Sequence, residues 1–99
     1  MTRKTPEGRF KAELTQELYE RFPGCIIMKN DEALLQGVPD MLILYNDRWA
    51  MLEVKRSLNA KRQPNQDYYV DVFNKMSFAA YISPENKEEV LHELQGTLG

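Results

Sequence analysis

Five polar side chains stand at positions where the sequence pattern favours buried residues. They are Glu7, Asp40, Glu53, Lys55 and Gln66. Burying an unpaired carboxylate costs several kcal/mol, so a convergence of these acids needs a compensating cation. Carboxylate oxygens suit Mg²⁺ or Mn²⁺, and a neighbouring lysine could stabilise charge on a phosphate or orient an attacking water. The residue types therefore point to metal-assisted hydrolysis.

The inward positions of Glu53 and Lys55 follow from the alternation of a strand predicted over residues 48–55. One face carries Trp49, Met51, Glu53 and Lys55, and the other carries Ala50, Leu52 and Val54. Two apolar faces are typical of a central strand that is covered on both sides. The two charged residues therefore emerge at the C-terminal end of an otherwise buried face. Asp40 opens the preceding predicted strand, directly after Pro39.

Two further positions follow from helical periodicity. An apolar stripe recurs every four residues at Phe10, Leu14, Leu18 and Phe22. Glu7 falls on the middle of this stripe, and Glu17 falls towards its edge. In a second predicted helix, Gln66 shares a stripe with Tyr69, Val70 and Phe73.

Each of these polar residues also has an ordinary structural interpretation. Glu53 and Lys55 could form a surface ion pair at a fraying strand end, and Asp40 could be a turn acid after a proline. Glu7 could simply favour the dipole of its helix from the first turn. Gln66 could be an ordinary polar residue of a first turn. No single motif decides between these interpretations.

The elements that must position these residues alternate between helix and strand. Thr5-Pro6-Glu7 predicts a helix start, because Thr is a good N-cap and Pro suits the first helical position. The full prediction is a helix to residue 22, strands over 25–28, 40–45 and 48–55, a helix over 64–76, a strand over 77–82, and a last helix capped by Ser83-Pro84. The order α-β-β-β-α-β-α predicts an α/β fold with a small mixed sheet flanked by helices.

Length and composition restrict the class of protein. The 99 residues suit one domain with one core, and 42% apolar and 28% charged residues are ordinary for a globular chain. One cysteine, Cys25, excludes an internal disulfide and a cysteine-rich zinc site. One histidine, His92, excludes a multi-histidine metal site. Any catalysis must therefore come from carboxylates and lysine.

The net charge of −2 conceals an asymmetry along the chain. Residues 1–62 carry a net charge of +2 and residues 63–99 a net charge of −4. Local fields matter more than net charge when a phosphate backbone binds. The cations that could make such contacts are Arg3, Lys4, Arg9, Lys11, Arg56, Lys61 and Arg62. This distribution permits nucleic-acid binding without requiring it.

Three motifs together resemble a known nuclease family. Gly37-Val38-Pro39-Asp40 is followed after thirteen residues by Glu53-Val54-Lys55, and Pro64-Asn65-Gln66 follows a basic loop. This order is similar to the PD-(D/E)xK nuclease motif, and more closely to the virus-type replication-repair nuclease (VRR-NUC) domain, over residues 5–83. The loop 29–36 departs from the family pattern, since it is more acidic and less rich in glycine.

The resemblance implies a role for each motif residue. Asp40, Glu53 and the carbonyl of Val54 would bind Mg²⁺ or Mn²⁺, and Lys55 would act on the water and the phosphate. Gln66 would support the site. Such domains also carry a glutamate on the first helix, for which Glu7 is the first candidate, directly or through water, and Glu17 the second.

The activity that the resemblance implies is metal-dependent hydrolysis of DNA by a structure-selective endonuclease. Small stand-alone members of the family are regarded as dimeric resolvases of four-way (Holliday) junctions in bacteria and phages. The sequence therefore predicts a homodimer acting on branched DNA in the cytoplasm of a bacterial or phage-infected cell, without a membrane or an organic cofactor. A nuclease for flaps, nicks or single strands, and a non-catalytic nucleic-acid-binding module with the same fold, remain as alternatives.

Overall fold

The computed structural model describes residues 5–99, so the predicted DNA contacts Arg3 and Lys4 lie outside the described residues. Its elements are α1 (Pro6–Arg21), β1 (Ile26–Lys29), β2 (Met41–Tyr45), β3 (Arg48–Val54), α2 (Gln66–Met76), β4 (Ala79–Ile82) and α3 (Lys87–Leu98). The predicted order of elements and the predicted α/β class with a mixed sheet are confirmed.

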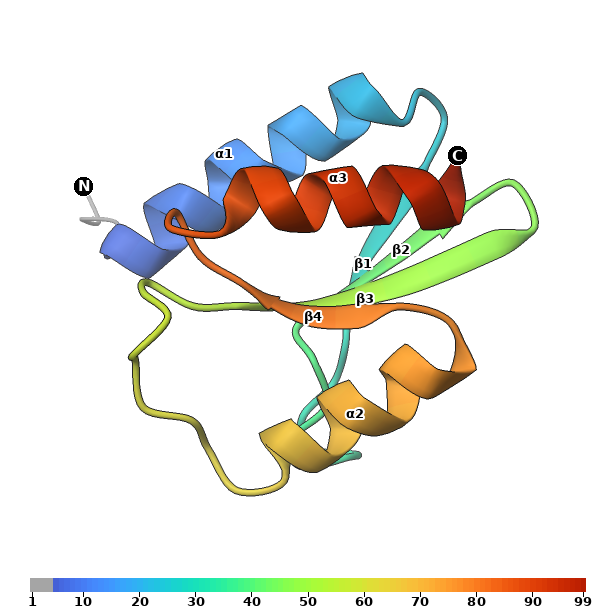
Figure 1. Cartoon of the computed structure of the whole chain (residues 1–99). Coiled ribbons are helices and arrows are strands. Elements are labelled where there is room, and N and C mark those ends of the chain that lie inside the picture. Colours follow the sequence, from blue (N-terminus) through green and yellow to red (C-terminus); the bar gives the residue numbers. More distant parts are fainter. Residues whose placement is uncertain (1–4) are drawn as a thin grey trace.

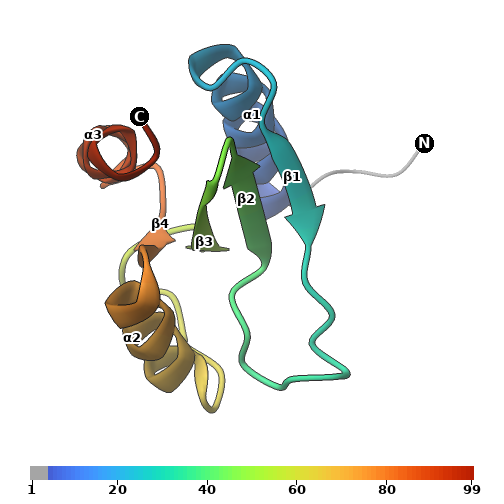
Figure 2. The same cartoon turned by 90° about the vertical axis from the view of Figure 1, so that its right-hand side faces the viewer.

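The four strands form one sheet in the order β1-β2-β3-β4. The pairs β1–β2 and β2–β3 are antiparallel, and β4 lies parallel to β3 because α2 crosses over between them. Helices α1 and α3 cover one face of the sheet, and α2 lies against the opposite face (Figures 1 and 2). The central position predicted for residues 48–55 is therefore confirmed.

The main core lies between the sheet and the pair α1 and α3. The inward stripe of α1 packs there with the apolar face of β3, and the buried residues include Phe10, Leu14, Leu18, Phe22, Ala50, Leu52 and Val54. Trp49 lies on the other face of β3 and meets the ring of Phe73 on α2 edge-on, with 6.2 Å between the centroids. Both faces of β3 are thus covered, as predicted.

Gly37 fixes the approach of the loop before β2 to the start of α2. It has a φ of +92°, and a Cβ at this position would lie 2.7 Å from the Cβ of Asn65. Asn65 itself has a positive φ of 70°. No other residue type could adopt this backbone conformation without meeting its neighbour. The loops that contain the first and third sequence motifs are therefore packed directly against each other.

Three predicted boundaries differ from the structure by two residues or more, and the others by one residue at most. Ser83-Pro84 does not cap the last helix, which begins only at Lys87 with Asn86 as its N-cap. The side-chain oxygen of Asn86 instead accepts a hydrogen bond from the backbone N–H of Ser83 at 2.8 Å, which favours a turn before the helix. The second helix begins at Gln66 rather than at Pro64. The fourth strand begins at Ala79, two residues later than predicted.

Across residues 5–99, no helix combines the length and the apolar character that crossing a membrane requires.

Candidate metal centre

Three acidic side chains meet at one end of the sheet. Glu32, Asp40 and Glu53 each offer a carboxylate oxygen, and these atoms all lie within 4.8 Å of one another. Asp40 directly precedes β2 and Glu53 lies near the end of β3. Since Met41 pairs with Leu52 in the antiparallel register, the next positions outward are those of Asp40 and Glu53. The sheet register therefore brings these two acids together.

The backbone of Asp40 is held from both sides. Its N–H donates a hydrogen bond of 3.1 Å to Oε1 of Glu53. Its carbonyl accepts one of 2.8 Å from the N–H of Asn30, and the Asn30 side chain donates to the carbonyl of Pro39 at 2.9 Å. These contacts leave the carboxylate of Asp40, whose side chain is 17% exposed, directed at solvent-accessible space.

Glu53 is almost completely buried, with 3% of its surface exposed. Its Oε2 accepts a hydrogen bond of 3.0 Å from Nε2 of Gln66. Burial, together with the nearby negative charge of Asp40, raises the pKa of Glu53 to about 7. The site is therefore built around a carboxylate that is costly to ionise without a cation.

Lys55 is buried beside this carboxylate and held by two acceptors. Its Nζ donates hydrogen bonds of 2.9 Å to Oε1 of Gln66 and 3.1 Å to the carbonyl of Lys61, and lies 3.9 Å from Oε2 of Glu53. Gln66 thus connects the carboxylate and the ammonium group through opposite ends of one amide. The N–H of Gln63 also donates to Oε1 of Gln66 at 2.9 Å, which anchors the start of α2 to the site.

The structure brings together four of the five polar residues singled out by the sequence pattern: Asp40, Glu53, Lys55 and Gln66. The inward orientation predicted for Glu7 is wrong, because Glu7 is exposed and lies outside the acidic cluster. Its position matches the apolar stripe, but the first turn of α1 extends past the edge of the core. Val54 has its side chain in the core, and metal binding by its carbonyl stays a prediction.

Glu17, the second candidate on the first helix, also lies outside the acidic cluster. Its Oε2 accepts a hydrogen bond of 2.8 Å from Arg21, and its Oε1 accepts one of 2.9 Å from Lys87. These contacts, the hydrogen bond from Lys87 above all, lower the pKa of Glu17. Glu17 therefore joins α1 to α3 and does not contribute to the acidic cluster.

Glu32 and Lys29 were missed by sequence reasoning. Both line a cleft of about 480 Å³ beside Asp40, together with Lys11, Asn30, Asp31 and Ala33. The sequence indicated Glu32 only through the unusual acidity of loop 29–36. A loop has no periodicity from which the direction of a side chain could be predicted. One acid of this loop, Glu32, supplies the third carboxylate of the cluster.

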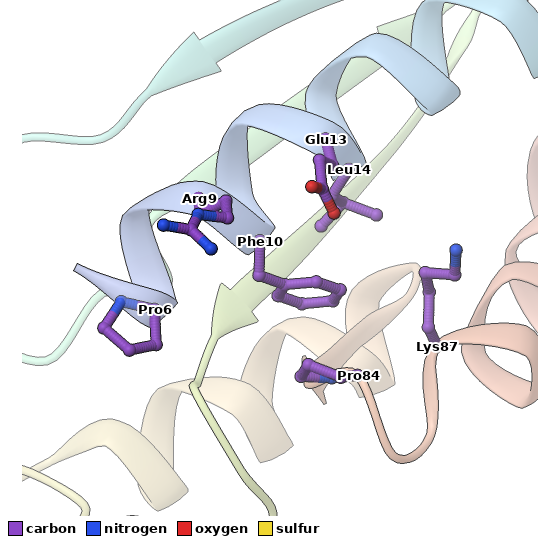
Figure 3. A pocket seen from close by; sticks show the side chains of 7 residues that line it. All are labelled: Pro6, Arg9, Phe10, Glu13, Leu14, Pro84 and Lys87. Carbon is purple, nitrogen blue, oxygen red and sulfur yellow. The ribbon is translucent and has the colours of Figure 1, made fainter. Parts of the chain in front are cut away.

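Four of the cations predicted to contact DNA are exposed: Arg9, Arg56, Lys61 and Arg62. Arg62 is also held in place, because it donates a hydrogen bond of 2.8 Å to Asp67 and lies 4.0 Å from the ring centre of Tyr81. Arg9 borders a separate cleft of about 340 Å³ between α1 and the start of α3, into which the ring of Phe10 projects near Pro84 (Figure 3). This second cleft shares no residue with the acidic cluster.

The donor set suits a hard divalent cation. Three carboxylate oxygens close to one another, without histidine or thiolate, favour Mg²⁺ or Mn²⁺ over softer metals. The raised pKa of Glu53 shows the electrostatic strain that such a cation would relieve. The residues present therefore fit the metal that the sequence pattern suggested, and Glu32 is the third acid beside Asp40 and Glu53.

Comparisons of the chain with models of protein families, with curated proteins and with solved structures give no match.

Proposed function

We propose that this protein is a metal-dependent DNA endonuclease with a PD-(D/E)xK core of the VRR-NUC type. One observation carries the proposal: a buried amide, that of Gln66, links the carboxylate of Glu53 to the ammonium group of Lys55, next to Asp40. A surface ion pair at a fraying strand end would not be buried or bridged in this way. The arrangement supports a built site for chemistry on an anionic substrate.

In the proposed site, Asp40, Glu53 and Glu32 hold a Mg²⁺ or Mn²⁺ ion, and the carbonyl of Val54 adds a ligand. The bound ion would polarise a phosphodiester and lower the pKa of a water. Glu53 is oriented by its two hydrogen bonds, so that little reorganisation is needed when the carboxylate ionises.

Lys55 supplies the positive charge at the phosphate. Its Nζ is held by Gln66 and Lys61 and keeps one N–H beyond these two acceptors. A positioned ammonium in a buried site stabilises the charge that develops in the transition state more strongly than it would in water. The same group can orient the attacking water.

The electrostatics of the surrounding surface suit a phosphate backbone. The N-terminal ends of all three helices lie at the end of the molecule where β3 and β4 finish (Figure 1), and these ends carry partial positive charge. Arg56 and Lys61 are exposed on the loop that follows β3. Contacts to phosphates carry no base information, so recognition would follow the shape of the DNA.

The substrate that we propose is a four-way junction, cut by a homodimer in a bacterial or phage-infected cell. The resemblance to VRR-NUC domains supports this choice. A two-fold dimer suits a junction that needs paired, symmetric cuts.

The test is cleavage of labelled four-way junction, flap, nicked and linear duplex DNA with Mg²⁺ or Mn²⁺, alongside Asp40→Ala. We expect symmetric cuts in the junction, and none without metal or in the variant, because the variant lacks one of the proposed metal ligands. Cutting of flaps or single strands would retain the site and change the substrate. Binding to DNA without any cutting would refute the nuclease and favour a binding module.

Metal affinity distinguishes Glu32 from Glu7 as the third glutamate or aspartate that binds the ion. Glu32→Gln should weaken Mn²⁺ binding by at least about 10-fold, since it removes one of the three carboxylates, whereas Glu7→Gln should change it less than about 2-fold. Isothermal titration calorimetry measures both variants under identical conditions. The reverse order of effects would restore the first-helix glutamate as a ligand and exclude Glu32.

A further inference from the structure

Lys11 forms an ion pair with the acid that we assign to the metal. Its Nζ lies 3.5 Å from Oδ2 of Asp40, and the two side chains are 32% and 17% exposed. No other ion pair of Lys11 occurs within residues 5–99. The ammonium group of Lys11 therefore lies against the carboxylate to which we assign the metal.

The same lysine borders the cleft that opens beside Asp40. Lys11, Lys29, Glu32 and Asp40 all line this space of about 480 Å³. Lys29 is exposed, and it forms no ion pair within the part of the chain that the structure describes. The cleft is thus lined by three carboxylates, those of Asp31, Glu32 and Asp40, and by two lysines, and it is large enough for a phosphate group.

We infer that Lys11 is exchanged between two partners: it pairs with Asp40 in the metal-free protein and moves to a DNA phosphate in the cleft when a divalent ion binds Asp40. The inference rests on the proposed function and names its phosphate subsite. A lysine has a long flexible stem and a compact charge, so a shift of a few ångströms needs no backbone movement.

The exchange couples metal binding to DNA binding. An ion at Asp40 competes with the ammonium group for the same carboxylate, and a phosphate in the cleft draws the ammonium away. Because such coupling is reciprocal, each ligand strengthens the binding of the other by the same factor. Within residues 5–99 Lys29 has no carboxylate partner, so it would contact phosphate whether or not metal is bound.

The test uses the salt dependence of DNA affinity, which reports the number of phosphates that a protein neutralises. Binding of a labelled four-way junction is measured by fluorescence anisotropy at several NaCl concentrations, with and without Ca²⁺, which takes the same oxygen ligands. The variants are Lys11→Met and Lys29→Met. Lys75→Met is the control, because this lysine is 76% exposed on α2 and pairs with Asp71.

Each phosphate contact on duplex DNA contributes about 0.9 to the slope of log K against log salt. Lys11→Met should lower the slope by about 0.9 with Ca²⁺ and leave it unchanged without Ca²⁺. Lys29→Met should lower the slope in both conditions, and Lys75→Met in neither. A second measurement, calorimetry without DNA, should show that Lys11→Met binds Ca²⁺ about 5-fold more tightly.

An equal loss of slope with and without Ca²⁺ would overturn the exchange and leave Lys11 as a constant phosphate contact. No loss in either condition would also overturn it. Failure of the proposed function gives a different result, because a protein that binds Ca²⁺ and DNA with the expected slopes but never cuts would retain the exchange and lose the nuclease. Absence of any Ca²⁺ binding by the wild-type protein would overturn the exchange, and absence of Mn²⁺ binding as well would overturn both.

Discussion

Replacing Lys55 with methionine is expected to lower the rate of DNA cleavage by about 100- to 1000-fold, the range found when one preorganised donor to a developing charge is removed. Methionine keeps most of the buried stem, so the loss falls on the ammonium group. The acceptors that it leaves, the amide oxygen of Gln66 and the carbonyl of Lys61, lose a donor in a largely buried position.

The measurement is single-turnover cleavage of a junction at saturating protein, with DNA affinity determined separately. We expect the DNA dissociation constant to change less than about 3-fold, because Lys55 is only 8% exposed and cannot contribute much to long-range attraction. Circular dichroism checks that the variant is folded. A folded variant that cuts at the wild-type rate would remove Lys55 from the proposed chemistry.

Metal affinity is expected to rise about 50-fold between pH 5 and pH 7. Burial raises the pKa of Glu53 to about 7, and the proton must leave before the carboxylate can bind a cation. Below pH 7 the proton competes with the metal, so each further pH unit costs close to tenfold in affinity. Titration calorimetry with Mn²⁺ in buffers from pH 5 to pH 8 follows this change, and it should plateau above pH 7.

The raised pKa of Glu53 also predicts that the protein without metal becomes less stable as the pH rises, whereas its metal affinity increases. A glutamate with a pKa near 4.5 when unfolded and about 7 when folded binds more protons in the folded state between these values. The free energy of unfolding therefore falls as the pH rises through this window, by about 3 kcal/mol in total. Urea denaturation measures the fall, and saturating Mn²⁺ should restore the lost stability at pH 8.

Glu53→Gln separates this residue from every other titrating group. The amide keeps the shape of the acid but retains only one of its two acceptor oxygens. The variant should therefore start from a lower stability, show a flat stability profile over the same window and bind Mn²⁺ weakly at all pH values. A wild-type profile that rises with pH from 5 to 7, or that matches the variant, would contradict the raised pKa of Glu53.

The strand residues of the site could be predicted because a strand alternates with a strict period of two. Once residues 48–55 are assigned to a central strand, Glu53 must share a face with Trp49 and Met51. The antiparallel register then leaves no freedom in where Asp40 lies relative to Glu53. The hydrogen bonds of Gln66, by contrast, depend on the path of the preceding loop, and only the direction of its side chain followed from the pattern.

The glutamates show where pattern arguments fail. Glu7 matches the buried stripe of α1 in angle, but burial also depends on position along the helix, and the first turn lies beyond the edge of the core. Glu32 occupies a loop, where no period relates sequence position to direction. Its position follows from tertiary packing, which brings a carboxylate oxygen of Glu32 within 4.8 Å of those of Asp40 and Glu53.

The close approach of Gly37 and Asn65 also matters for how this chain tolerates change. The segment with Asp40 and the segment with Gln66 are 26 positions apart, yet they meet through a glycine that has no room for a methyl group. A single added carbon at Gly37 would push the two segments apart and disconnect the amide of Gln66 from both of its charged partners. A designer who transplants this site to another scaffold must therefore move both loops as one cassette.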